Sequence, residues 1–153
     1  MNIRRIFEKY KVNAQDGRVF DVIRNKFIRA TPEEIIRQRT IKFLIYRLGV
    51  PRDKIGIELS LHQLGCMDNK RRADICIFDE NKTVLAVIEC KAYYVGNREE
   101  PYSQVIDYAW NLKVPNFFVV DGCEMNGFFY NSALDQYEPF DEIPTYEMMK
   151  NTQ

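Results

Sequence analysis

Hydrophobic residues recur along this chain with two periods, and these predict both helices and strands. Residues 31–49 (TPEEIIRQRTIKFLIYRLG) carry apolar side chains at helical spacing. Thr31 is a candidate N-cap, Pro32 suits the first turn, and Gly49 suits the end of the helix. These signals predict an amphipathic helix with one apolar face.

Shorter apolar runs bounded by polar turns predict strands. We expect strands at residues 55–61, 72–78, 83–92, 116–120 and 127–131, with residues 79–82 (DENK) as a turn. The predicted fold class is therefore α/β, a central mixed β-sheet flanked by helices.

Other segments have weaker patterns. Residues 18–30 look extended, residues 2–11 suggest a short helix, and the tail after Ala133 is acidic and weakly patterned. Residues 101–112 predict an amphipathic helix whose inward-facing side chains are Val105, Ile106, Ala109 and Trp110.

The bulk composition is that of an ordinary globular protein. The 153 residues are 46% hydrophobic and 29% charged, so we expect one domain over residues 1–153. No run approaches the ~20 apolar residues of a membrane span, and the charged N-terminus lacks a signal core, so we expect a cytoplasmic protein without a membrane partner. The four cysteines form no CxxC pair, which favours free thiols. Neither GxxxxGK[ST] nor GxGxxG occurs, so no nucleotide ligand is expected.

Charge is distributed unevenly although the net charge is zero. Residues 1–50 hold 12 Lys and Arg against 5 Asp and Glu, residues 51–100 hold 8 against 9, and residues 101–153 hold 2 against 8. The basic first part can face a polyanion or match the acidic last part internally. Zero net charge argues against tight nucleic-acid binding by this domain alone.

Both faces of the strand predicted at residues 83–92 are largely apolar, which predicts a central strand with cover on each side, yet this strand also carries charge. Side chains alternate along a strand, so Glu89 and Lys91 share one face while the Cys90 side chain points into the core on the other. If the DENK turn centres between residues 80 and 81, Asp74 lies opposite Val87 and therefore on the same face as Glu89, as its diagonal neighbour roughly 7 Å away. Two carboxylates at this separation can hold one divalent cation, with the lysine beside it. The alternative is a salt bridge between Lys91 and either carboxylate.

Further polar residues are candidates for the same site. Glu34 follows Thr31 by three residues, which fits a capping box as well as an acidic site residue. Gln104 and Tyr108 share one face of their predicted helix and can contact a nucleic-acid backbone, or can be ordinary surface residues. Arg71 and Arg72 begin the strand of Asp74 and can bind phosphates or form a solvated loop.

The ordered set of PEExxRQ, RAD, ECKA and QxxxY resembles the PD-(D/E)xK nuclease superfamily. In particular, residues 18–125 are similar to the N-terminal nuclease domain of type I restriction enzyme R subunits, with a RecB-like QxxxY motif. The chain differs in having Ala73 in place of the motif's proline and in lacking the helicase regions of an R subunit. An excised or stand-alone nuclease-like domain is the corresponding expectation.

The resemblance implies a restriction-endonuclease-like fold and Mg²⁺-dependent (or Mn²⁺-dependent) DNA cleavage in restriction or defence. It implies Asp74 and Glu89 as metal ligands, the Cys90 carbonyl as a third ligand, and Lys91 as the catalytic lysine. It also implies Glu34 as the acidic residue of the first helix, and Gln104 and Tyr108 as supports of the site and of DNA. Restriction-system subunits or a second copy of the chain are further candidate partners. A catalytically inactive nucleic-acid- or protein-binding module, and a nuclease for RNA or branched DNA, stay open as alternatives.

Overall fold

The apolar runs of the sequence form a mixed six-stranded sheet. The structure, a computed structural model, describes residues 8–67, 71–92, 106–107 and 109–151. The spatial order of the strands is β3-β4-β5-β6-β7-β8, in which β5 and β6 run parallel and all other neighbours run antiparallel. The strands are β3 (Ile55–Ser60), β4 (Arg72–Phe78), β5 (Val84–Cys90), β6 (Asn116–Val120), β7 (Met125–Asn131) and β8 (Gln136–Pro139). The predicted α/β class, with a restriction-endonuclease-like sheet, is confirmed.

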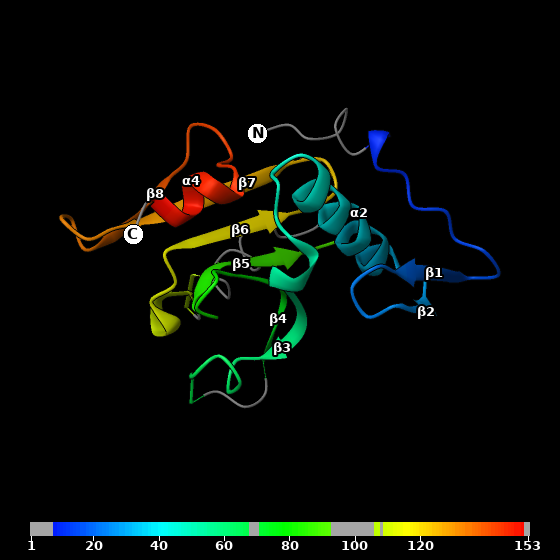
Figure 1. Ribbon diagram of the computed structural model, residues 1–153, viewed down its shortest axis with the longest axis horizontal. Helices are drawn as coiled ribbons and strands as arrows, with labels where there is room; N and C mark the ends of the chain where they lie inside the picture. Colours follow the sequence, from blue (N-terminus) through cyan, green and yellow to red (C-terminus); the bar gives the residue numbers. More distant parts are fainter. Residues whose placement is uncertain (1–7, 68–70, 93–105, 108, 152–153) are drawn as a thin grey trace.

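The longest helix, α2 (Pro32–Tyr46), begins where the sequence predicts it. The Thr31 hydroxyl accepts a 3.1 Å hydrogen bond from the Glu34 amide, which makes Thr31 the N-cap. Helix α2 crosses the sheet near the end of β5 (Figure 1). Its apolar side packs with strand residues in a core that includes Ile41, Leu44, Ile75, Ile88 and Phe118.

The opposite side of the sheet is covered as well. A second core contains Cys76, Val87, Ala109 and Phe117. Strand β5 contributes to both cores, which confirms the prediction of a central strand with cover on each face. The side chain of Cys90 belongs to the α2 side and is fully buried, also as predicted.

The inward face predicted for residues 101–112 is partly wrong. Residues 106–107 and 109–112 are helical and Ala109 is buried, but Ile106 and Trp110 are 42% and 46% exposed. The Trp110 ring packs edge-on against two tyrosines from β7 and β8, so these strands hold it at the surface. Val105 lies outside the described residues.

Segments without a clear pattern also form elements. The extended stretch at residues 18–30 is a hairpin of β1 (Arg18–Asp21) and β2 (Lys26–Arg29), separate from the main sheet. It lies beside the first turns of α2, at one end of the molecule (Figure 1). The acidic tail supplies β8 and a short helix α4 (Tyr146–Asn151), and a 3-10 turn η1 (Arg52–Lys54) precedes β3. Of the helix predicted at residues 2–11, residues 8–9 are helical and residues 1–7 lie outside the described part.

Candidate nuclease site

Asp74 of β4 lies next to the part of β5 that carries Glu89 and Cys90. The two strands pair with Ile75 opposite Ile88, so the register continued by one residue puts Asp74 directly opposite Glu89. The Cys90 amide donates a 2.7 Å hydrogen bond to Asp74 Oδ2. Asp74 and Glu89 are each only 8% exposed. Two buried carboxylates therefore meet on neighbouring strands.

The register that the sequence predicts for this hairpin is wrong by two residues. Asp74 was expected opposite Val87, and Cys76 takes that place. The register shifts between Ile77 and Phe78, where the pairing of the two strands is irregular. A shift of two residues preserves the alternation of faces, so the expected approach of the two carboxylates survives the error.

Lys91 follows β5 and pairs with Glu89. Its Nζ lies 2.7 Å from Glu89 Oε1, and its backbone amide donates a 2.8 Å hydrogen bond to the Val120 carbonyl of β6. Burial alone would lower the pKa of Lys91, but the hydrogen bond that Lys91 donates to Glu89 and the charges of Glu89, Asp74 and Glu33 outweigh it and raise that pKa. Lys91 is therefore a firmly protonated ammonium within an acidic cluster. This contact is the one that the salt-bridge interpretation expects.

Arg37 of α2 joins carboxylates from two elements. Its Nη2 donates a 2.6 Å hydrogen bond to Asp74 Oδ1, and its Nη1 donates a 2.5 Å hydrogen bond to Glu34 Oε2. Glu33 and Glu58 lie 3.7 and 3.6 Å from the same guanidinium. Burial opposes the charge of Arg37, yet the attraction of Asp74 and Glu34 outweighs burial and raises the pKa of Arg37. The sequence analysis includes Arg37 in the PEExxRQ motif but gives it no role, because an arginine on a helix does not indicate a partner on a distant strand.

A second arginine extends this network to the β1–β2 hairpin. Arg24 lies in the turn between β1 and β2. It donates hydrogen bonds to Glu34 Oε1 at 3.2 Å, to Glu58 Oε2 at 2.8 Å and to the buried carboxylate of Asp21. Charges therefore alternate from Asp21 through Arg24, Glu34 and Arg37 to Asp74.

Glu34 belongs to this network rather than to a reciprocal capping box. Its amide is capped by Thr31, but the Thr31 amide donates to the Arg29 carbonyl. The Glu34 carboxylate instead accepts hydrogen bonds from Arg37, from Arg24 and, at 3.1 Å, from Gln38 Nε2. The backbone of Glu34 thus serves the cap while its side chain reaches the site through Arg37.

The remaining predicted site residues are Arg71, Arg72, Gln104, Tyr108 and Cys90. Arg71 and Arg72 are exposed at the start of β4. Gln104 and Tyr108 lie outside the described residues. The Cys90 side chain is buried in the core, and burial, followed by the nearby Asp74 charge, raises the pKa of its thiol well above the usual value, while its backbone amide contacts Asp74.

The donor set suits a hard divalent cation. Mg²⁺ is usually held by one or two carboxylates together with water and phosphate oxygens. Asp74 and Glu89 supply two carboxylates, and a carboxylate oxygen that accepts one hydrogen bond keeps a second lone pair for a metal. Among residues 8–67, 71–92, 106–107 and 109–151, no group of three or more His, Cys, Asp or Glu residues is arranged to hold a metal ion. A metal held here would therefore have two protein carboxylates, Asp74 and Glu89, as its side-chain ligands.

A cleft of about 480 Å³ opens beside the arginine network. Its lining combines the β1–β2 hairpin, the first turns of α2 and the residue after Lys91, namely Arg24, Ile28, Arg29, Thr31, Pro32, Glu33, Glu34, Arg37, Glu58 and Ala92. The side chains of Glu33, Glu34, Glu58, Arg24 and Arg37 thus face a space open to solvent, whereas Asp74, Glu89 and Lys91 are not among its lining residues.

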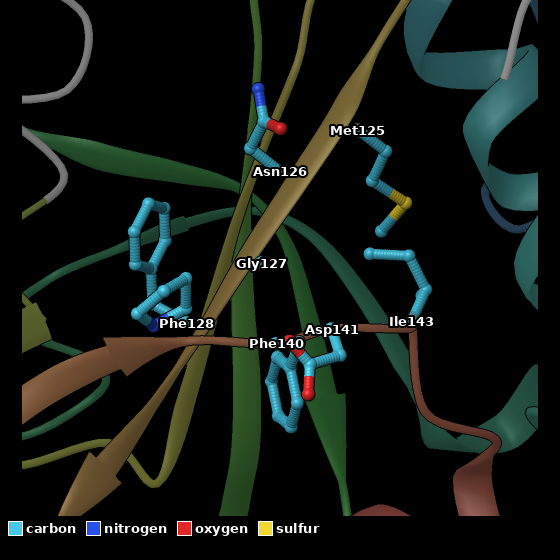
Figure 2. Close-up of a pocket in the computed structure, with 8 residues that line it drawn as sticks. Met125, Asn126, Gly127, Phe128, Phe140, Asp141 and Ile143 are labelled. Carbon is cyan, nitrogen blue, oxygen red and sulfur yellow. The ribbon is translucent and has the colours of Figure 1, made fainter. Parts of the chain in front are cut away.

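A smaller hollow of about 280 Å³ lies between β7 and the segment that follows β8 (Figure 2). Met125 and Ile143 point toward each other across it, and Phe140 lies along its side (Figure 2). The lining contains no lysine or arginine and a single carboxylate, Asp141. This hollow lacks the charged groups of the cleft.

The sheet, with a carboxylate on one strand and an E-x-K sequence on the next, defines a restriction-endonuclease-like nuclease fold. Residues 32–144 match the model of the family described as type I restriction enzyme R protein N terminus (HSDR_N). The chain belongs to this family and is thereby related to restriction nucleases. No match was found among the curated proteins. Within the described residues, no helix has the length and apolar character needed to cross a membrane.

Proposed function

We propose that the chain is a DNA endonuclease that depends on Mg²⁺ or Mn²⁺ and acts in DNA restriction. The observation that carries this proposal is the meeting of Asp74, Glu89 and Lys91 at the ends of two paired strands. Membership of the type I restriction enzyme R protein N-terminal family supports the coarser part of this proposal, a role related to restriction nucleases.

The residues have distinct roles in this proposal. Asp74 and Glu89 would hold the metal, with the Cys90 carbonyl as a further ligand. The bound metal would neutralise the phosphate and acidify a water molecule. An ammonium has three donors, so Lys91 can hold Glu89 and also donate to the attacking water or to a phosphate oxygen. Glu34 acts at a distance, because it holds Arg37 against Asp74.

Substrate and partners are part of the proposal. Duplex DNA carries a dense array of phosphates, and Arg71 and Arg72 at the start of β4 can bind them outside the cleft. Gln104 and Tyr108 remain candidates for backbone contacts. Restriction-system subunits, or a second copy of the chain for cutting both strands, are the proposed protein partners.

Plasmid nicking tests the activity. Wild-type protein should convert supercoiled DNA to open circles with Mg²⁺ or Mn²⁺ and not with EDTA. Lys91→Ala should abolish nicking, because it removes the ammonium beside Glu89. Lys150→Ala is the matched control, since Lys150 also pairs with glutamates, at 2.9 Å from Glu147 and 3.0 Å from Glu80, but on α4. Nicking that survives Lys91→Ala would refute the assigned role.

Calorimetry separates the nuclease from an inactive binding module of the same fold. The nuclease proposal expects Mn²⁺ binding that Asp74→Asn abolishes, together with nicking by the wild type. An inactive module gives no metal-dependent nicking by the wild type under any tested condition. Because Asp74 also pairs with Arg37, the melting temperature of the variant must be measured beside its metal binding.

A further inference from the structure

The β1–β2 hairpin has one face turned into the molecule and one turned out. Arg18 is opposite Arg29 and Phe20 is opposite Phe27, and opposite residues share a face. The intervening residue Val19 is 1% exposed and packs inward. The outward face therefore presents two arginines and two phenylalanines together.

This outward face is chemically unusual for a surface. Phe20 and Phe27 are 40% and 58% exposed, and their ring centroids lie 5.2 Å apart at 66°. Arg18 and Arg29 are exposed and directly opposed, and like charges in this position destabilise a hairpin. Neither arginine forms an ion pair with an acidic residue in the part of the chain that the structure describes. The edge-on pair of rings stabilises the hairpin, but both rings and both arginines stay exposed, as on a surface that binds an external ligand.

The hairpin is also placed at the candidate nuclease site. Arg29 and Ile28 line the same cleft as Glu34 and Arg37 of α2. The turn residue Arg24 reaches the carboxylate network directly, as described above. A ligand on the outward face of the hairpin therefore lies next to the entrance of this cleft.

The charge of the hairpin selects a polyanion over an apolar protein surface. Its exposed charged side chains are Arg18, Lys26 and Arg29, all basic. Its carboxylate, Asp21, is buried and paired with Arg24. Arginine beside exposed aromatic rings is the combination that binds nucleic-acid strands, because guanidinium groups contact phosphates while rings stack on bases.

We propose that the outward face of the β1–β2 hairpin binds an unpaired DNA strand and leads it to the cleft. Arg18 and Arg29 contact its phosphates, and Phe20 and Phe27 stack on its bases. Bases within a duplex already stack on each other and show only their edges, so exposed rings favour an unpaired segment. The inference rests on the proposed nuclease function for its choice of DNA.

Binding of fluorescent oligonucleotides, measured by anisotropy in EDTA, tests the proposal without any cleavage. Wild-type protein should bind a single strand more tightly than a blunt duplex of equal length. Replacing both Phe20 and Phe27 by alanine should weaken single-strand binding about 10-fold or more, given the usual effect of removing a stacking ring. Replacing Arg18 and Arg29 by glutamine should lower the salt dependence of binding, by a slope of about 0.7 for each lost phosphate contact.

A matched control is available at the other end of α2. Tyr46 is 62% exposed, and its hydroxyl accepts a hydrogen bond from Arg52. Tyr46→Ala with Arg52→Gln removes an aromatic ring and an arginine from the surface, and should leave DNA binding unchanged.

The outcomes separate this inference from the proposed activity. Hairpin variants that bind single strands as the wild type does, or a wild type that prefers duplex, would overturn the inference even if Mg²⁺-dependent nicking is found. Variants that change the oligomeric state while DNA affinity stays constant would also overturn it, in favour of a protein contact. Loss of binding in the hairpin variants, with Lys91→Ala still binding, supports the inference whether or not the wild type nicks DNA.

Discussion

Replacing Arg37 by methionine should strongly destabilise the fold, because it leaves two buried carboxylates without their positively charged partner. The guanidinium is 5% exposed and donates to Asp74 at 2.6 Å and to Glu34 at 2.5 Å. Removing one partner from a buried ion pair typically costs about 3–5 kcal/mol. Methionine is similar to arginine in helix propensity and to its apolar stem in length, so loss of the positive charge accounts for most of the change in the free energy of unfolding. For a chain of this size the loss corresponds to a fall in Tm of about 6–20 °C.

Urea unfolding at pH 7 measures the effect, and a double-mutant cycle assigns it. Asp74→Asn should cost less on the Arg37→Met background than in the wild type, with a coupling of about 1–3 kcal/mol. Arg39→Met is the control, since Arg39 lies on the same helix and forms no ion pair within the described residues. A loss below about 1 kcal/mol for Arg37→Met, or a coupling near zero, would refute the view that Arg37 holds Asp74 in place.

Three further predictions test other features. Hydrogen bonds from Arg24 and Ile23 outweigh burial and lower the pKa of Asp21 below 3.8. As pH falls, Asp21 therefore takes up its proton in the unfolded chain before it does so in the folded protein. The stability that Asp21 provides relative to Asp21→Asn should be complete above about pH 4 and should decline below it, which urea unfolding of both proteins at pH 7 and pH 3 measures. Gly127→Ala should cost about 1–3 kcal/mol, because an added Cβ would lie 2.4 Å from the Phe118 ring, and an unchanged Tm would contradict this contact. A thiol reagent should modify Cys66 and Cys123 in the folded protein and all four cysteines in urea, because Cys76 and Cys90 are fully buried and burial raises the pKa of Cys76 to about 12. Rapid modification of all four cysteines in the folded protein would contradict this burial.

Local signals were enough to predict the positions of most elements. Thr31 and Pro32 mark the start of α2, and a continuous apolar run marks β5 as a strand buried on both faces. The approach of Asp74 to Glu89 was also predictable, since it needs only alternation and a hairpin. The exact register was not, because the irregular pairing between Ile77 and Phe78 has no local signal in the sequence.

Contacts between distant elements could not be predicted from one sequence. Arg37 occupies an ordinary polar position of an amphipathic helix, and its partner Asp74 is 37 positions away. The exposure of Trp110 likewise depends on β7 and β8, the second of which lies in the weakly patterned tail. Side-chain identity at such positions indicates charge or bulk but not the partner.

The hydrogen bond from the Lys91 amide to the Val120 carbonyl has a consequence for the order of folding. The antiparallel strands β3, β4 and β5 follow one another in sequence, so loop closure between them is inexpensive. The parallel partner β6 begins only at Asn116, beyond a long crossover, and such non-local pairing forms slowly. Asp74 and Glu89 can therefore meet before the backbone of Lys91 is anchored. We therefore expect the backbone of Lys91 to become fixed only when β5 pairs with β6, a later step than the pairing of β4 with β5.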